Sequence, residues 1–79
     1  MSSTPDDYLR DLGELIKERA REAKREKEAA VGTDRYDYEM GRLMALHEVV
    51  SMMQQQAEAF GLDFSALALD DISPEEHLT

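Results

Sequence analysis

KERAREAKREKEAAVGTDRYDYEMGRLMALHEVV, residues 17–50, contains the feature that decides the fold: two helix-period stretches separated by Gly32-Thr33-Asp34. Apolar residues recur every three or four positions through residues 5–31 and again through residues 35–60, which is the spacing of an amphipathic helix. Because so short a connection places the two helices side by side and antiparallel, the chain is predicted to fold back on itself. We expect an all-α fold, an antiparallel hairpin of two long helices.

The first predicted helix has a well-defined beginning at residue 5. Thr4 can cap the helix, and Pro5 occupies the first helical position, where its missing N–H removes no hydrogen bond. Asp6 and Asp7 follow in the first turn, near the positive end of the helix dipole. Residues 1–4 are expected to be a disordered N-terminus.

Glycines mark the ends of both helices. Gly32 suits the left-handed conformation that often ends a helix, and Thr33 or Asp34 can cap the helix that follows. Gly61 suits the same conformation at the end of the second helix, where Leu62 can close a Schellman motif. The hairpin is therefore predicted to occupy residues 5–61.

The two helices differ in how much apolar surface they carry. At about 100° per residue, the apolar residues of the first helix fall on an arc about 140° wide, and those of the second on an arc about 220° wide. A single neighbouring helix cannot cover the wider arc, so the second helix needs at least two neighbours. The residues expected in the hairpin core are Leu9, Leu12, Ile16, Ala20, Ala23, Leu46, Met53, Ala57 and Phe60.

The face of the first helix turned away from this core is expected to be solvated. Residues 17–28, KERAREAKREKE, are mostly charged, and i,i+3 pairs such as Glu14/Lys17 stabilise such a helix by a few tenths of a kcal/mol each. In the seam between the helices, Gly13 is expected to lie opposite Gln54, where it would let the two backbones approach closely.

The second neighbour of helix 35–60 is expected to be the same helix of a second copy. Two hairpins that share this face would form a homodimeric four-helix bundle with two-fold symmetry. The predicted dimer interface consists of Tyr36, Met40, Leu43, Met44, His47, Val50 and Gln54.

Residues 62–79 are predicted to be an acidic C-terminal segment with short helical turns. Asp63 can cap a short helix over residues 64–69, and Ser73 followed by Pro74 can begin a terminal turn. Two placements are open: the segment folds back onto the hairpin, or it docks on another protein and becomes ordered there. Folding back is favoured, because an exposed apolar run invites aggregation.

Composition narrows the functional classes. The chain has 79 residues, a net charge of −9 and no cysteine. Residues 43–79 contain seven acids and no Lys or Arg, a surface that repels phosphate backbones, so direct nucleic-acid binding is not expected. The absence of cysteine fits the reducing cytoplasm, and no apolar run approaches the roughly 18 residues of a membrane span. A cytoplasmic protein without membrane contact is expected.

One semi-polar stripe on the second helix is a candidate site. His47, Ser51, Gln54 and Glu58 lie within about 60° of one another, and Arg42 could join them at the seam of a dimer. The functional interpretation is a small polar site in which His47 titrates near neutral pH. The structural interpretation, an interface rim or a polar pair that fixes the helix register, is favoured because no partner nucleophile can be identified.

One family resemblance involves the first helix and the glycine after the second. The positions concerned are Leu12, Leu15, Ile16, Glu18, Arg19 and Ala23, with Gly61-Leu62-Asp63 later in the chain. This pattern resembles the small all-helical chorismate mutases, whose active sites bind a dicarboxylate through Arg and Lys. The resemblance implies a helical enzyme with an anion site built around Arg19.

The chain departs from that family at the positions that carry its chemistry. With Arg19 matched to the arginine of the family's first helix, Ala30 stands where the catalytic lysine belongs. Ser2 stands where the arginine lent by the other subunit belongs, and Arg42 falls near another arginine of the family. A third long helix with its catalytic glutamine is missing. Without those cations, a dicarboxylate site has little to stabilise its transition state.

Three hypotheses about function follow. The leading one is a small non-catalytic protein–protein interaction module, a homodimer that presents an acidic surface to a protein partner. The second is a small helical enzyme or binder of an anionic ligand at the dimer seam, and the third is an acidic mimic of nucleic acid that inhibits a basic partner. No catalytic residue, metal site or cofactor is predicted, because the two histidines lack metal-ligand spacing and the acidic pairs lack the pattern of a calcium loop.

Overall fold

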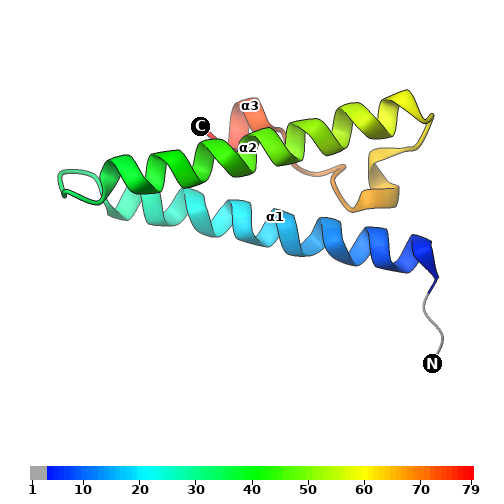
Figure 1. Ribbon diagram of the computed structural model, residues 1–79, viewed down its shortest axis with the longest axis horizontal. Coiled ribbons are helices and arrows are strands. Elements are labelled where there is room, and N and C mark those ends of the chain that lie inside the picture. Colours follow the sequence, from blue (N-terminus) through cyan, green and yellow to red (C-terminus); the bar gives the residue numbers. More distant parts are fainter. Residues whose placement is uncertain (1–3) are drawn as a thin grey trace.

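The computed structural model describes residues 4–79 and shows two long antiparallel helices against which the C-terminal segment lies (Figure 1). Helix α1 spans Pro5–Ala29 and α2 spans Tyr36–Ala59. A 3-10 helix, η1, follows at Phe64–Leu67, and the short α3 spans Pro74–His77. The predicted all-α hairpin is confirmed, and its helices begin and end within two residues of the predicted bounds.

A capping box begins α1. The backbone N–H of Asp7 donates to Thr4 Oγ1 at 3.1 Å, and the N–H of Thr4 donates back to Asp7 Oδ2 at 3.3 Å. These two bonds satisfy backbone donors that have no partner inside the helix. Thr4 therefore belongs to the helix cap, whereas the rest of the predicted disordered N-terminus lies outside the described residues.

The turn between the long helices is built differently from the prediction. Gly32 does adopt a positive φ of 82°. The cap of α2, however, is Arg35, which makes no side-chain cap bond, so the prediction of Thr33 or Asp34 as cap was wrong. Thr33 instead holds the turn itself, because its hydroxyl donates to the carbonyl of Ala30 at 2.7 Å and accepts from the N–H of Arg35 at 3.2 Å.

The Schellman motif predicted at the end of α2 is present. Gly61 has a φ of +69°, and its N–H donates to the carbonyl of Glu58 at 3.1 Å. The N–H of Leu62 reaches the carbonyl of Ala57 at 2.8 Å. Both bonds satisfy carbonyls left open at the helix end and turn the chain back toward α1.

The C-terminal segment packs against both long helices, as the favoured placement predicted. Its apolar side chains Leu67, Leu69, Ile72 and Leu78 are buried in one cluster with residues of α1 and α2. The 3-10 helix η1 contacts α1, and α3 contacts α2. These side chains now contribute to the core of the chain itself, so they are not a free docking segment.

The short turns of this segment form without the side-chain caps that were predicted. Neither Asp63 nor Ser73 makes a cap bond with its side chain. At α3 the bond runs the other way, since the backbone N–H of Ser73 donates to Nδ1 of His77 at 2.9 Å. Ala68, just after η1, adopts a left-handed conformation with φ of 57° and reverses the chain.

Gly13 makes room for the C-terminal segment rather than for α2. A Cβ at this position would lie 1.6 Å from the carbonyl oxygen of Leu67, so no larger residue fits without moving η1. The three atoms nearest to that Cβ all belong to Leu67, so the close approach to α2 predicted for Gly13 is not what this glycine provides. The close approach that this glycine permits is between α1 and η1.

The wide apolar arc of α2 thus finds its second neighbour inside the same chain. Leu43 and Val50 are fully buried, in a cluster with Leu69, Ile72 and Leu78 of the C-terminal segment. Among the described residues, neither long helix carries an apolar stretch sufficient to cross a membrane.

Candidate functional site

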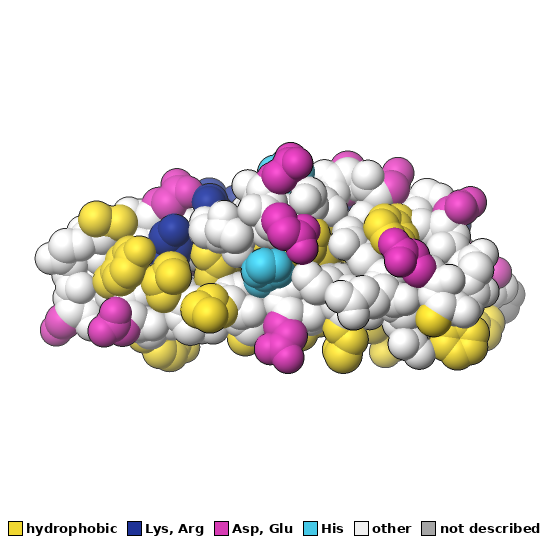
Figure 2. Space-filling model, turned by 90° about the horizontal axis from the view of Figure 1, so that it is seen from above, with side chains coloured by type: hydrophobic (Ala, Val, Ile, Leu, Met, Phe, Trp, Pro, Cys, Tyr) yellow, Lys and Arg dark blue, Asp and Glu magenta, His cyan; other side chains and the backbone are white. Residues whose placement is uncertain are grey.

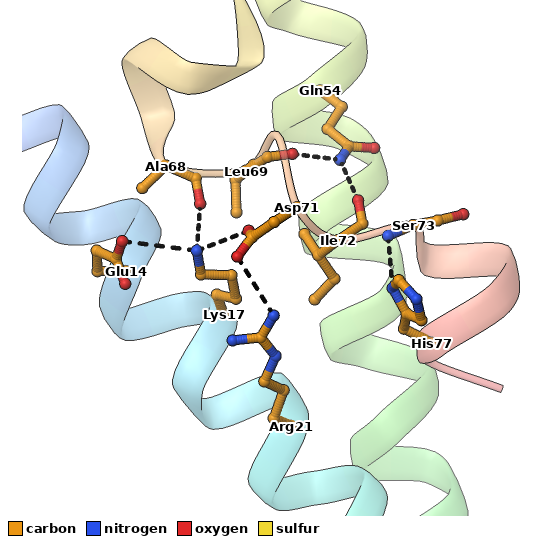
Figure 3. Close-up of polar contacts among 10 residues, drawn as sticks. All are labelled: Glu14, Lys17, Arg21, Gln54, Ala68, Leu69, Asp71, Ile72, Ser73 and His77. Carbon is orange, nitrogen blue, oxygen red and sulfur yellow. Dashed lines mark hydrogen bonds and ion pairs between the residues drawn. The ribbon is translucent and has the colours of Figure 1, made fainter.

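A buried lysine fastens the C-terminal segment to α1. Lys17 is only 5% exposed, and its Nζ donates to the carbonyl of Ala68 at 2.7 Å and to Asp71 Oδ1 at 2.8 Å (Figure 3). Glu14 Oε1 lies 3.5 Å from the same nitrogen. A buried ammonium group is tolerated because it is hydrogen-bonded and paired with carboxylates.

Gln54 fastens the same segment from the opposite helix. Its Nε2 donates to two backbone carbonyls, that of Leu69 at 3.1 Å and that of Ile72 at 2.9 Å. Figure 3 shows Lys17 and Gln54 pointing toward the segment from α1 and α2. The stretch between η1 and α3 is therefore held by one long polar side chain from each helix.

Asp71 is the titratable group most affected by this arrangement. The hydrogen bond from Lys17 holds the pKa of the Asp71 carboxyl below its usual value of 3.8, and the charges of Lys17 and Arg21 act in the same direction. Arg21 Nη2 lies 3.6 Å from Asp71 Oδ2. The carboxylate is half-exposed, so solvent screens part of this attraction.

Lys17 was assigned to a solvated helix face, and this assignment was wrong. The predicted Glu14/Lys17 pair is present, but the lysine lies under the C-terminal segment. One signal in the sequence could have indicated this: Gly13 and Ala20 stand four positions before and three positions after Lys17, so the lysine lies on a strip of small residues. A long side chain on such a strip can reach a neighbouring backbone.

The structure places three of the seven residues of the predicted dimer interface against the C-terminal segment. Leu43 and Val50 are buried within the single chain, and Gln54 is bonded to the segment. Tyr36, Met40 and His47 are half-buried, and Met44 is 61% exposed. Met44 is thus the residue of this set that remains most available to a second molecule.

Within the single chain, four residues of the predicted polar site share one face of α2, as expected, but Arg42 does not join them. Arg42 Nη2 pairs with Glu22 Oε1 of α1 at 3.2 Å, on a side of α2 about 140° away from His47. Gln54 is committed to the C-terminal segment, whereas His47 and Ser51 are half-buried and Glu58 is exposed. The geometry offers no convergent acid, base and nucleophile.

Glu39 is a buried acid that the sequence did not reveal. It is 3% exposed, and its Oε1 accepts a hydrogen bond from Arg35 Nη2 at 3.1 Å. Its Oε2 accepts no hydrogen bond from residues 4–79 but lies 3.9 Å from Arg42 Nη1. Together with the Arg42–Glu22 pair, these contacts tie the beginning of α2 to α1 by charge.

Most of the residues predicted for the hairpin core lie in or against it. Ala20, Ala23 and Ala57 are fully buried, and Leu12 is half-buried. Phe60 differs, because it is 72% exposed at the point where α2 ends and the chain turns away. The remaining members, Leu9, Ile16, Leu46 and Met53, are partly buried against the cluster.

Phe60 borders an apolar pocket at the open end of the hairpin. The pocket has a volume of about 210 Å³ and opens to solvent. Six of its seven lining residues are apolar, and Gln56 contributes the polar side chain. The lining residues come from α1, α2, the turn after α2 and η1: Leu9, Met53, Gln56, Ala57, Phe60, Leu62 and Leu67.

Two other hollows have several charged side chains in their lining. One, of about 160 Å³, lies at the closed end of the hairpin beside Glu26, Arg35 and Glu39. The other, of about 230 Å³, lies along α1 and includes Lys17 and Arg21. Within residues 4–79 no three His, Asp or Glu side chains form a group that could hold a metal ion.

The chain matches no protein family, no curated protein and no solved structure with which it was compared. The resemblance to chorismate mutases gains no support from the fold. After α2 the described chain contains the four-residue η1 and the four-residue α3 in place of a third long helix. Ser2, at the position of the lent arginine, lies outside the described residues.

Proposed function

We propose that this chain is a small non-catalytic protein–protein interaction module that binds a partner at the open end of its hairpin. The observation that carries the proposal is the apolar pocket lined by Leu9, Met53, Phe60, Leu62 and Leu67. Its volume of about 210 Å³ is below the roughly 300–1,000 Å³ of small-molecule sites. A single large apolar side chain of a partner suits it better than a cofactor.

The charge around the pocket indicates the chemistry of that partner. Asp6 and Asp7 precede Leu9 at the start of α1, Glu58 lies in the last turn of α2, and Asp63 follows Leu62. Residues 43–79, which supply six of the seven lining residues, contain no Lys or Arg. A partner segment with one apolar anchor between Lys or Arg residues would therefore match both the pocket and its surroundings.

A selection from a random peptide library tests this function directly. Peptides enriched on the immobilised protein are expected to carry a large apolar residue flanked by Lys or Arg. Phe60→Glu should weaken their binding at least tenfold, because it places a charge at the mouth of the pocket. Phe60 is 72% exposed, so the substitution leaves the core intact.

Met44→Glu is the matched control, since Met44 is 61% exposed on another part of α2. It adds the same charge and should leave peptide binding unchanged. A library that yields no enriched sequence, or peptides that bind the Phe60→Glu protein as tightly as the unsubstituted one, would overturn the proposal.

We also propose that the protein works in a reducing compartment such as the cytoplasm. The proposal is supported by a sequence of 79 residues without cysteine. Proteins as small as this that act in oxidising compartments usually depend on disulfides.

A further inference from the structure

One strip along α2 is free of charge. Ala45, Val49, Met52, Gln56 and Ala59 follow one another at spacings of four, three, four and three, which places them on one face of the helix. We call these five residues the outer seam. Val49 is half-buried, the other four are exposed, and Met52 is 59% exposed. None of these five residues has a titratable side chain, although the chain has a net charge of −9.

Three residues of the outer seam face away from the core that α2 shares with its two neighbours. Ala45, Met52 and Ala59 each stand two positions after a buried residue of the core, which turns them about 160° away from it. Ala45, Met52 and Ala59 are therefore exposed on the side away from the core. Val49 is half-buried, and Gln56 borders the pocket that Leu9 of α1 also lines. Figure 2 shows hydrophobic side chains at intervals along the lower edge of the molecule. An acidic group stands among them near the middle, two more lie at the left end, and most of the other acidic groups in this view lie above.

Helix α1 adds exposed apolar residues that are also turned away from the C-terminal segment. Tyr8 is 67% exposed and Leu15 is 49% exposed. Both lie about 140–160° around α1 from Gly13, the residue against which η1 packs. The hairpin thus has one face covered by its own C-terminal segment and an opposite face with unpartnered apolar side chains on both helices.

We infer that the outer seam is where a second copy of this chain docks, with the two α2 helices antiparallel and a two-fold axis near Met52. In that arrangement Met52 meets Met52 of the second copy, Ala45 meets Ala59, and Val49 meets Gln56. The small residues at both ends let the helix axes approach to about 8 Å. The contact extends about 21 Å along the helices.

Charge favours a second copy over a basic partner at this face. A strongly anionic chain meets an identical anionic chain with the least repulsion where neither carries a charge, and the outer seam meets that condition. A basic partner would gain more by contacting the acidic surfaces elsewhere. The resulting dimer is a four-helix bundle, but it uses the opposite side of α2 from the interface predicted around Leu43 and Val50.

Because the chain has no cysteine, single cysteines can map the contact. Met52→Cys should form a disulfide-linked dimer almost completely when the protein is oxidised with glutathione disulfide, since the two thiols meet on the axis. Met44→Cys is the matched control, equally exposed and part of the earlier predicted interface. It should remain monomeric on a non-reducing gel, and efficient cross-linking at Met44 instead of Met52 would overturn the inference.

A mixture of two variants tests the antiparallel arrangement. Ala45→Cys and Ala59→Cys should each link poorly to themselves and efficiently to each other. Self-linking of Ala45→Cys as efficient as the mixed product would indicate parallel helices and would refute the arrangement.

Sedimentation supplies a readout that does not depend on cysteine. The unsubstituted protein should sediment as a dimer at tens of micromolar, and Met52→Glu as a folded monomer with unchanged helix content, because it brings two like charges together on the axis. If the unsubstituted protein is a monomer, the inference is overturned, and this holds also if a different protein binds the outer seam. A dimer that persists in Met52→Glu would overturn it as well.

Discussion

At the scale of single residues, one glycine decides whether the C-terminal segment can lie against α1. Gly13 carries only hydrogen where any other residue would place a Cβ 1.6 Å from the carbonyl oxygen of Leu67. The neighbour is backbone, which cannot rotate aside as a side chain would. The requirement for glycine here comes from space and not from a left-handed conformation, since Gly13 lies inside α1.

Gly13→Ala should therefore destabilise the protein by about 1–3 kcal/mol or more, because η1 must move. Gly41→Ala provides the matched control, as no atom lies within 4 Å of a Cβ at that helical position. The control should stabilise the protein by about 0.5–1 kcal/mol, the usual gain of alanine over glycine in a helix. Urea unfolding followed by circular dichroism measures both, and equal effects of the two substitutions would contradict this role of Gly13.

Asp71 makes stability depend on acid pH. The hydrogen bond from Lys17 lowers the pKa of Asp71 in the folded chain below 3.8. The ionised carboxylate is therefore more stable in the folded than in the unfolded state. The stabilisation is fully present well above pH 3.8 and is lost as the pH falls through the folded pKa. Lower pH therefore protonates the unfolded chain first and favours unfolding.

Asp71→Asn should remove this part of the pH dependence. Between pH 5 and pH 2 the melting temperature of the unsubstituted protein should fall more steeply than that of the variant, and the two curves should converge at the acid end. Asp70→Asn, at the neighbouring exposed position, is the control and should follow the unsubstituted protein. A steep fall that persists unchanged in Asp71→Asn would contradict the assignment to Asp71.

At the scale of elements, the C-terminal segment completes the core of the hairpin. Leu69 and Leu78 are fully buried, and the backbone near them is held by Lys17 and Gln54. Without this segment, Leu43 and Val50 of α2 would lose the neighbours that cover them. The hairpin alone would therefore expose a wide apolar surface.

Removal of residues 63–79 should abolish cooperative thermal unfolding. Each buried leucine contributes about 2–5 kcal/mol, and a domain of this size has a total stability of only about 5–15 kcal/mol. Retaining Leu62 preserves the Schellman bond to Ala57, so the end of α2 stays intact. A truncated protein with an unchanged melting temperature would show that the hairpin is stable by itself.

A single substitution tests the packing of the C-terminal segment without removing the segment. Leu69→Ala should lower the free energy of unfolding by about 2–5 kcal/mol while a single cooperative transition remains. Two separate transitions in this variant would mean that the hairpin and the C-terminal segment unfold independently.

At the scale of the whole molecule, α2 is the central element. It packs against α1, against the C-terminal segment and, in the dimer that we infer, against its own copy through the outer seam. The apolar arc of α2 is wide because its residues make contacts with more than one neighbouring element. The mismatch between the two long helices was correctly read as a need for a second neighbour, but that neighbour lies within the same chain.

The sequence by itself determined the features that depend on near neighbours in the chain. The capping box at Thr4, the Schellman motif at Gly61 and the two long helical periods each involve residues within five positions of one another. Local backbone sterics and hydrogen bonding are sufficient to specify such features. The existence, type and approximate bounds of the helices could therefore be predicted.

Only the tertiary structure decided which long-range partners these elements take. Lys17 is buried because residues 68 and 71 cover it, 51 and 54 positions away, and Gly13 is needed because Leu67 arrives beside it. The same helical pattern would accommodate either a second copy or the chain's own C-terminal segment against Leu43 and Val50. The C-terminal segment is favoured because contacts within one chain do not require the loss of translational entropy that association of two chains requires. The periodicity of either helix contains no information about this difference.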